Sequence, residues 1–260
     1  MPLTAIPGAS QALGVITVHW LVGTVRETVH ETPSAVSLRL DVDGWPGHRP
    51  GQHVDVRLTA EDGYSAQRSY SIASPPGAKY VELTVVRIEQ GEVSPYLTNI
   101  VEPGDKIELR GPIGGYFIWD ANDDRPVLLV GGGSGVVPLM AMVRTRAATG
   151  THSPLRLVYS VRGPDDALYA AELAERQRGD DGLQIDCVYT RTTPAGWPVP
   201  PGRIGAAALT TPGWAPDRSP AVFVCGPTGF VEAVANLLVN AGHDPRTIKT
   251  ERFGPSGGQS

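Results

Sequence analysis

The 260-residue sequence contains only two cysteines, Cys187 and Cys225, which lie far apart in the chain. Two cysteines exclude a disulfide scaffold, a four-cysteine zinc site and a four-cysteine iron–sulfur cluster. The six histidines include no pair four residues apart, so no metal-binding helix is indicated. We therefore expect no bound metal.

Long apolar runs and an excess of positive charge are also missing. No stretch reaches the roughly 18 consecutive apolar residues of a membrane-spanning helix. Residues 1–10 lack the basic start and the apolar core of a secretory signal. The net charge of −5 argues against a protein that binds nucleic acid through phosphate contacts. The sequence favours a cytoplasmic protein with no membrane span and no nucleic-acid partner.

What the sequence does contain is two regions with different hydrophobic patterns. Residues 1–18 are small and weakly patterned, and we expect them to be loosely held. Between residues 19 and 122, short segments alternate apolar and polar residues with Gly/Pro turns between them, and one short helix is expected at 94–100. The alternating segments are 20–29, 35–42, 53–58, 81–86 and 106–110. This pattern is typical of an antiparallel barrel or sandwich.

The pattern changes near residue 122, and we assign residues 123–260 to a second domain. Residues 127–130 form a continuous apolar run, as in a strand buried on both faces. Further strands are expected at 155–160, 183–189 and 221–225, helices at 139–148, 167–178 and 229–240, and an irregular excursion at 192–220. This alternation predicts a doubly wound α/β parallel sheet. Its ligand should lie beyond the carboxyl ends of the strands, in the cleft between the domains.

The first candidate motif is Arg68-Ser69-Tyr70-Ser71. A bound flavin needs a cation for its phosphate, a flat ring against its isoalloxazine and a small hydrogen-bond donor near N5. Strand alternation would put Arg68 and Tyr70 on the same side of one extended segment. A plain strand with a buried tyrosine would show the same residues.

The second motif is Gly91-Glu92-Val93-Ser94-Pro95. Ser94 is a good helix N-cap, and Pro95 suits the first helical position. A helix start next to glycine offers free N–H groups to a pyrophosphate. An ordinary capped helix is the alternative.

Two further motifs lie in the second domain. Residues 131–135, Gly-Gly-Gly-Ser-Gly, join a buried strand to a helix, where a dinucleotide phosphate can approach the backbone. The turn is not the usual G-x-G-x-x-G, because valines occupy the place of its last glycine, and it lacks the lysine of a P-loop. Cys225-Gly226-Pro227 places a thiol at the end of a strand, although a buried cysteine before a loop would look alike.

In their order along the chain, these motifs, together with Gly-Pro-Ile-Gly-Gly-Tyr-Phe at 111–117, resemble the ferredoxin–NADP reductase superfamily over about residues 19–254. The resemblance implies an FAD-binding barrel at 19–122 and an NAD(P)-binding α/β domain at 123–260. It implies an enzyme that moves hydride from a reduced nicotinamide to a flavin. FAD is expected rather than FMN, as the commoner choice in the family.

The resemblance also implies roles for individual residues. Ser71, Cys225 and Glu251 would act at the reacting rings, with Glu251 in the polar network of Ser71 and Phe253 covering the flavin face. The alternative for the last two is a final strand with an exposed acid. The residues expected to bind the cofactors are Arg68, Ser69, Tyr70, Ser71, Val86, Gly91, Val93, Ser94, Gly132, Gly133, Ser134, Gly135, Arg162, Arg191, Arg203, Cys225, Gly226, Pro227 and Phe253.

The choice between NADPH and NADH and the identity of the electron acceptor rest on fewer residues. Arg162, Arg191 and Arg203 could bind a 2′-phosphate, which favours NADPH over NADH, although some NADH-using relatives keep an arginine like Arg191. The chain has no iron–sulfur module, and residues 254–260 are too few for one, so electrons should pass to a separate ferredoxin or oxygenase component. A free flavin or ferric-chelate reductase, and a non-catalytic flavin-binding electron-transfer subunit, remain as alternatives.

Overall fold

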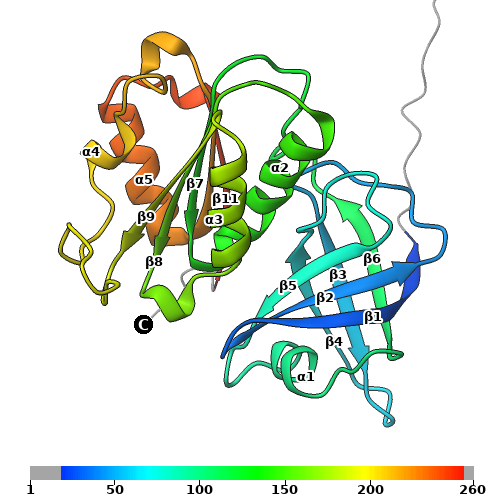
Figure 1. The fold of residues 1–260 in the computed structure, drawn as a ribbon. Coiled ribbons are helices and arrows are strands. Elements are labelled where there is room, and N and C mark those ends of the chain that lie inside the picture. Colours follow the sequence, from blue (N-terminus) through cyan, green and yellow to red (C-terminus); the bar gives the residue numbers. More distant parts are fainter. Residues whose placement is uncertain (1–18, 255–260) are drawn as a thin grey trace, which may run out of the picture.

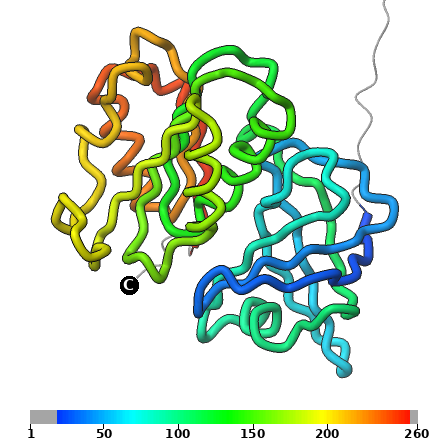
Figure 2. The backbone as a smooth tube through the Cα atoms, viewed as in Figure 1, coloured from blue at the N-terminus to red at the C-terminus, as the bar shows by residue number. Residues whose placement is uncertain are grey.

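The computed structural model describes residues 19–254, which form two halves of different architecture (Figure 1). Figure 2 shows them side by side, with the blue-to-green part of the chain in one half and the green-to-red part in the other. The expectation that residues 1–18 are loosely held concerns residues outside the described range. Within that range, no helix is long and apolar enough to cross a membrane.

The first half is a six-stranded antiparallel sheet that curls into a barrel, as predicted. Its strands are β1 (Trp20–Thr32), β2 (Ala35–Val42), β3 (His53–Thr59), β4 (Ser65–Ser71), β5 (Val81–Val86) and β6 (Lys106–Ile113), in the order β4-β3-β6-β1-β2-β5. An Ile72–Leu83 bridge brings the end of β4 to β5, the two outermost strands. Every second side chain points inward, and Leu38, Val54 and Leu109 are completely buried.

The second half is a five-stranded parallel sheet in the order β11-β10-β7-β8-β9. The strands are β7 (Val127–Gly132), β8 (Leu155–Val161), β9 (Leu183–Tyr189), β10 (Ala221–Pro227) and β11 (Ile248–Phe253). Helices α2 (Val136–Thr149) and α3 (Ala170–Gly179) cover one face, and α5 (Thr228–Asn240) covers the other. The predicted doubly wound α/β architecture is confirmed.

The helix starts differ from their predicted positions for local reasons. Helix α2 begins three residues early, because Val136 and Val137 continue directly from the 3₁₀ turn at Gly133–Gly135. Helix α3 begins three residues late, because Tyr169 has a φ of 57°, a left-handed conformation that no helix interior accepts. The excursion at 192–220 contains the short helix α4 (Ala206–Leu209).

The two halves share part of their core. Ala35, Ala73, Phe117 and Trp119 are buried in one cluster with the apolar side chains of α2. Phe117 packs edge-on against Phe223 of β10, with ring centroids 5.5 Å apart. This apolar contact fixes the barrel against the α2 face of the parallel sheet.

Candidate functional site

The Arg68–Ser71 motif occupies β4, an edge strand of the barrel sheet. The strand alternates as expected: Tyr70 packs against the barrel core, and the Arg68 side chain, on the same side, is 53% exposed. Burial raises the pKa of Tyr70 to about 12, so its hydroxyl stays protonated. On the opposite side, Ser69 Oγ donates to Asp55 at 2.7 Å.

The Gly91–Ser94 segment lies beside Arg68. Arg68 Nη2 donates to the Glu92 carboxylate at 2.9 Å, which joins β4 to the segment before α1 (Ser94–Asn99). The expectation that Ser94 is the N-cap was wrong, since Val93 holds that position. The chain turns back at Gly91, so Ser94 Oγ instead accepts the Ile88 N–H at 3.0 Å. Arg68 and this turn therefore lie side by side, with the guanidinium paired to Glu92 and the Gly91 N–H donating to the Ile88 carbonyl at 2.8 Å.

The glycine turn after β7 brings its backbone into very close contact with β10. Gly133 has a φ of 55°, which favours glycine. At Gly135, a Cβ would lie 2.1 Å from the Cys225 carbonyl oxygen, so no larger residue fits. The glycines thus have a structural reason in addition to the suspected phosphate contact. The turn leads directly into α2, and the N–H of Val136, the first residue of that helix, donates to the carbonyls of Gly133 and Ser134.

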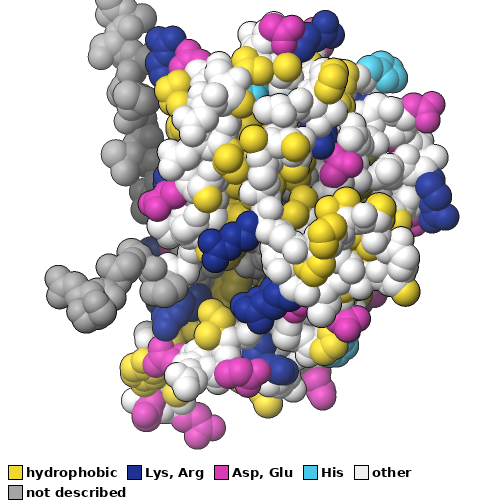
Figure 3. Space-filling view, turned by 90° about the vertical axis from the view of Figure 1, so that its left-hand side faces the viewer, with side chains coloured by type: hydrophobic (Ala, Val, Ile, Leu, Met, Phe, Trp, Pro, Cys, Tyr) yellow, Lys and Arg dark blue, Asp and Glu magenta, His cyan; other side chains and the backbone are white. Residues whose placement is uncertain are grey.

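An open cleft of about 650 Å³ runs between the two halves. From the barrel it is lined by Val86, Arg87 and neighbouring residues of β1–β2 and the loop after β5. The α/β half contributes the carboxyl ends of its strands, including Gly132, Gly133, Ser134, Arg162, Pro227 and Phe253. Figure 3 shows a hollow between the upper and lower parts of the molecule with dark blue side chains at its rim. Seven of the expected cofactor residues therefore meet in one space.

A second cavity, of about 420 Å³, brings Ser71 and Glu251 together. His53, Ser69 and Tyr116 also line it, so it lies between β3–β4 and β11. Glu251 is on a final strand, as the alternative interpretation held, but it is half-buried rather than exposed. Burial raises the pKa of Glu251 to about 7. The group can therefore hold or release a proton near neutral pH.

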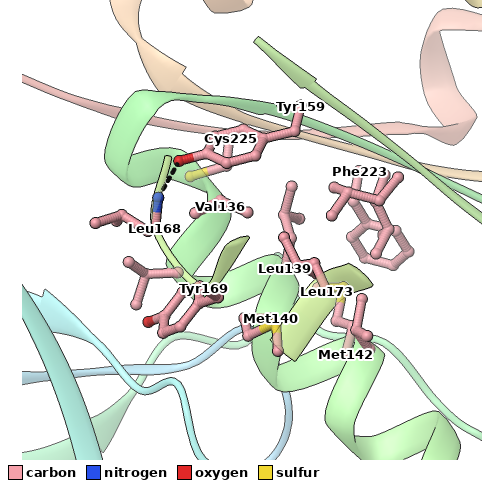
Figure 4. Packing of buried hydrophobic residues seen from close by; sticks show 14 of the residues in the cluster. Val136, Leu139, Met140, Met142, Tyr159, Leu168, Tyr169, Leu173, Phe223 and Cys225 are labelled. Carbon is pink, nitrogen blue, oxygen red and sulfur yellow. Dashed lines mark hydrogen bonds between the residues drawn. The ribbon is translucent and has the colours of Figure 1, made fainter. Parts of the chain in front are cut away.

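Cys225 lies behind the cleft and lines neither cavity. Its side chain is completely buried, and Figure 4 shows the sulfur among Tyr159, Val136 and Leu168. Burial, and secondarily the charge of Glu251, raises the pKa of this thiol, which therefore stays protonated. Cys225 and Glu251 are paired neighbours in β10 and β11. The thiol contributes packing beneath the strand ends and no exposed nucleophile.

The three candidate phosphate-binding arginines follow the carboxyl ends of β8 and β9. Arg162 lines the cleft, and its carbonyl accepts the Arg191 N–H at 2.9 Å. Arg203 follows Gly202, whose N–H donates to the Tyr189 carbonyl at 2.9 Å. Within residues 19–254, none of the three forms an ion pair. Their guanidinium groups are exposed and available to an anion.

Sequence reasoning missed Phe230 and His53. Phe230, in the first turn of α5, lines the cleft, and its ring occupies the space above Gly132 and Gly226, where added Cβ atoms would lie 2.7 Å from it. An aromatic residue three positions after Cys-Gly-Pro was a usable signal. His53 faces Ser71 and Glu251 only because β3 pairs with β4, and no local pattern marks it.

The raised pKa of Glu251 predicts a pH-dependent stability. Between about pH 4.5 and 7 the folded protein keeps a proton that the unfolded chain loses, so this contribution falls as the pH rises. Glu251→Gln should leave stability nearly unchanged at pH 4.5 and increase it by about 3 kcal/mol at pH 8. Urea unfolding at both pH values measures the difference. The exposed Glu232→Gln is the control, and an equal gain at both pH values for Glu251→Gln would contradict the assignment.

Comparisons with known proteins agree with this geometry. An oxidoreductase FAD-binding domain model matches residues 24–118, and an oxidoreductase NAD-binding domain model matches residues 129–236. Ferredoxin–NADP reductase B of Sorangium cellulosum is 34% identical over 212 residues, which cover 78% of this chain and 84% of that protein. The glycine betaine monooxygenase reductase subunit of Chromohalobacter salexigens is 33% identical over 79% of this chain. The chain spans only 56% of that relative's length.

Solved structures show the same arrangement. The FAD/NAD-binding domain of nitric oxide dioxygenase from Vibrio cholerae has a TM-score of 0.79 at 26% identity, covering 90% of this chain and 99% of that one. An Amycolatopsis cytochrome P450 reductase has a TM-score of 0.78 at 26% identity, covering 92% and 71%. Both are similar to this chain through the barrel and the parallel sheet together.

Proposed function

Because the chain belongs to the ferredoxin–NADP reductase superfamily, we propose that it is an FAD-dependent NAD(P)H reductase that oxidises NADPH in preference to NADH and passes the electrons to a separate protein. The observation that carries this proposal is the cleft, to which Val86 of the barrel and Gly132–Ser134 of the sheet both contribute. FAD bound there would accept hydride and release single electrons.

Different residues of the chain would bind the flavin phosphates, the flavin ring and the nicotinamide dinucleotide. We assign the flavin phosphates to Arg68 and the Gly91–Ser94 turn, and the ring to the space between Tyr70 and Phe253. The Gly132–Gly135 turn would hold the dinucleotide through its N–H groups. Ser71 and Glu251 would donate and accept protons at the flavin edge, because one cavity contains both side chains. We place the division between the two domains between residues 122 and 123.

The test is anaerobic mixing of the purified flavoprotein with each nucleotide. We expect NADPH to bleach the flavin absorbance, with kcat/KM at least tenfold above that for NADH. Bleaching by NADH with a tenfold advantage would overturn the nucleotide preference. A flavin that stays oxidised with both would favour a non-catalytic flavin-binding subunit.

The preference for NADPH should depend on Arg191. Arg191→Gln should lower kcat/KM for NADPH by about tenfold or more, because a charge-assisted contact to the 2′-phosphate is worth about 1.5–3 kcal/mol. The NADH value should stay within about twofold. Arg178→Gln, an exposed arginine of α3, is the matched control. Equal losses with both nucleotides would show that Arg191 does not contact the 2′-phosphate.

The acceptor is proposed from the relatives. One relative is the ferredoxin–NAD(P)(+) reductase component of a Ralstonia naphthalene 1,2-dioxygenase/salicylate 5-hydroxylase system, at 29% identity over 90% of this chain. We propose a ferredoxin or an oxygenase component as the partner. Capture from the producing cells under reducing conditions, followed by reduction of the captured protein with NADPH, tests this. Equal turnover with free flavin or ferric chelates would favour the small-molecule reductase instead.

A further inference from the structure

Arg144 of α2 is one of the side chains that join the two halves through polar contacts, and it makes contacts to both. It is only 9% exposed. Its Nη1 donates to the Ala73 carbonyl at 3.0 Å and to the Glu82 carboxylate, both in the barrel. Its Nε and Nη2 hold Glu172 of α3 in a two-pronged contact at 3.0 and 2.6 Å. All three guanidinium nitrogens are therefore used: Nη1 bonds the barrel, and Nε and Nη2 bond α3 of the α/β half.

The barrel residues held by Arg144 lie where the barrel sheet closes. The Ala73 N–H donates to the Glu82 carbonyl at 2.8 Å, and next to this pair is the Ile72–Leu83 bridge. We call residues 72–73 and 82–83 the seam. Ala73 follows Ser71 by two residues, so a shift of the seam would move the end of β4. Arg144 therefore contacts the barrel next to the end of β4, the strand assigned to flavin binding.

In the α/β half, helix α2 connects Arg144 rigidly to the glycine turn after β7. Helix α2 begins at Val136, directly after Gly133–Gly135, and Arg144 lies about 12 Å along it. A helix of this kind does not bend over two turns without a proline or glycine, and its only proline, Pro138, lies in the first turn. The position of Arg144 against the seam therefore sets the position of the glycine turn against β4.

Tyr169 makes a second contact to the same face of the barrel. Its ring lies under the Arg144 guanidinium, 5.1 Å from centroid to Cζ, and its hydroxyl bonds Thr84 of β5. Its N–H donates to Glu31 of β1 at 3.2 Å. In Figure 4 the Tyr169 hydroxyl points away from the α/β core. Glu82, Thr84 and Val86 are alternate residues of β5, and Val86 lines the cleft.

We propose that Arg144 is a positioning residue for hydride transfer, which fixes the distance between the flavin and nicotinamide halves through Glu82 and Ala73. Apolar packing could hold the halves together by itself, since buried ion pairs often add little net stability. The planar fork of an arginine adds a defined direction, which a lysine cannot reproduce. The inference rests on the proposed function, because it concerns the two rings that meet in the cleft.

The test compares Arg144→Lys with Arg146→Lys. Arg146 is on the same helix, is 4% exposed and holds Asp180 in a similar fork, but all its partners are in the α/β half. In anaerobic rapid mixing, Arg144→Lys should slow flavin reduction by about 10- to 100-fold, the effect of an ångström-scale misplacement. The Kd of the nucleotide should change less than about threefold. With nucleotide deuterated at C4, a kinetic isotope effect on flavin reduction should show that hydride transfer limits the rate. Arg146→Lys should reduce at the wild-type rate.

A second measurement needs no nucleotide. Hydrogen exchange followed by mass spectrometry should show faster exchange at residues 72–86 in Arg144→Lys, and at residues 150–154 and 180–183 in Arg146→Lys. Reduction within twofold of wild type and unchanged exchange at the seam would overturn the inference, as would equal slowing by Arg146→Lys. If Arg144→Lys does not fold, Tyr169→Phe should show the same pattern with a smaller effect, and normal rates and exchange there would overturn it. Failure of the wild type to reduce flavin would instead refute the proposed function.

Discussion

Gly135→Ala should cost about 3 kcal/mol of folding stability, the upper end for overpacking, and nearly abolish flavin reduction by nucleotide. The added Cβ would lie 2.1 Å from the Cys225 carbonyl oxygen and 2.8 Å from Gly226 Cα. Both obstacles are backbone atoms of β10, a central strand, so neither can rotate away. The glycine turn must therefore move, and with it the N–H groups assigned to the dinucleotide.

Urea unfolding and the anaerobic reduction rate measure the two effects. Gly179→Ala is the control, because it ends α3 with no atom within 4 Å of an added Cβ and with an ordinary φ. It should leave reduction unchanged and stabilise the protein by up to about 1 kcal/mol. Wild-type stability and rate in Gly135→Ala would refute the close approach of this turn to β10.

Glu82→Gln should destabilise the protein by about 3–5 kcal/mol. The Glu82 side chain is 1% exposed and accepts from Arg144 through one oxygen and from Arg39 Nε at 2.9 Å through the other. Glutamine has almost the same shape but keeps only one acceptor oxygen. Its amide group would face an arginine N–H, which leaves a buried donor without a partner.

Glu108→Gln is the matched control for this loss. Glu108 also pairs with an arginine of the barrel sheet, Arg57, at 2.8 Å, but its side chain is 37% exposed. An exposed pair of this kind contributes at most about 1 kcal/mol. Unfolding of both variants in urea, with the flavin content held equal, gives the comparison. Equal losses for the two would show that Glu82 is not the buried centre that the structure describes.

Local sequence determined the architecture because hydrophobic periodicity is a short-range property. Alternation at 53–58 and a continuous apolar run at 127–130 were sufficient to distinguish a half-buried strand from a fully buried one. The motif at β4 and the glycine turn after β7 were visible because each gathers its distinctive residues in one short segment. The limits of α3 were missed because the left-handed Tyr169 has no sequence signal.

Only the tertiary structure decided which residues meet across the two halves. Arg144 and Glu82 are 62 positions apart, and neither stands in a recognisable motif. The burial that raises the pKa of Glu251 and the close approach of Gly135 to Cys225 also depend on elements that are distant in the sequence. Local pattern fixes the type of each element, whereas desolvation, ion pairing and close contact depend on how distant elements pack. The sequence by itself therefore determined the two architectures, the antiparallel barrel and the parallel α/β sheet, and packing decided how they are aligned.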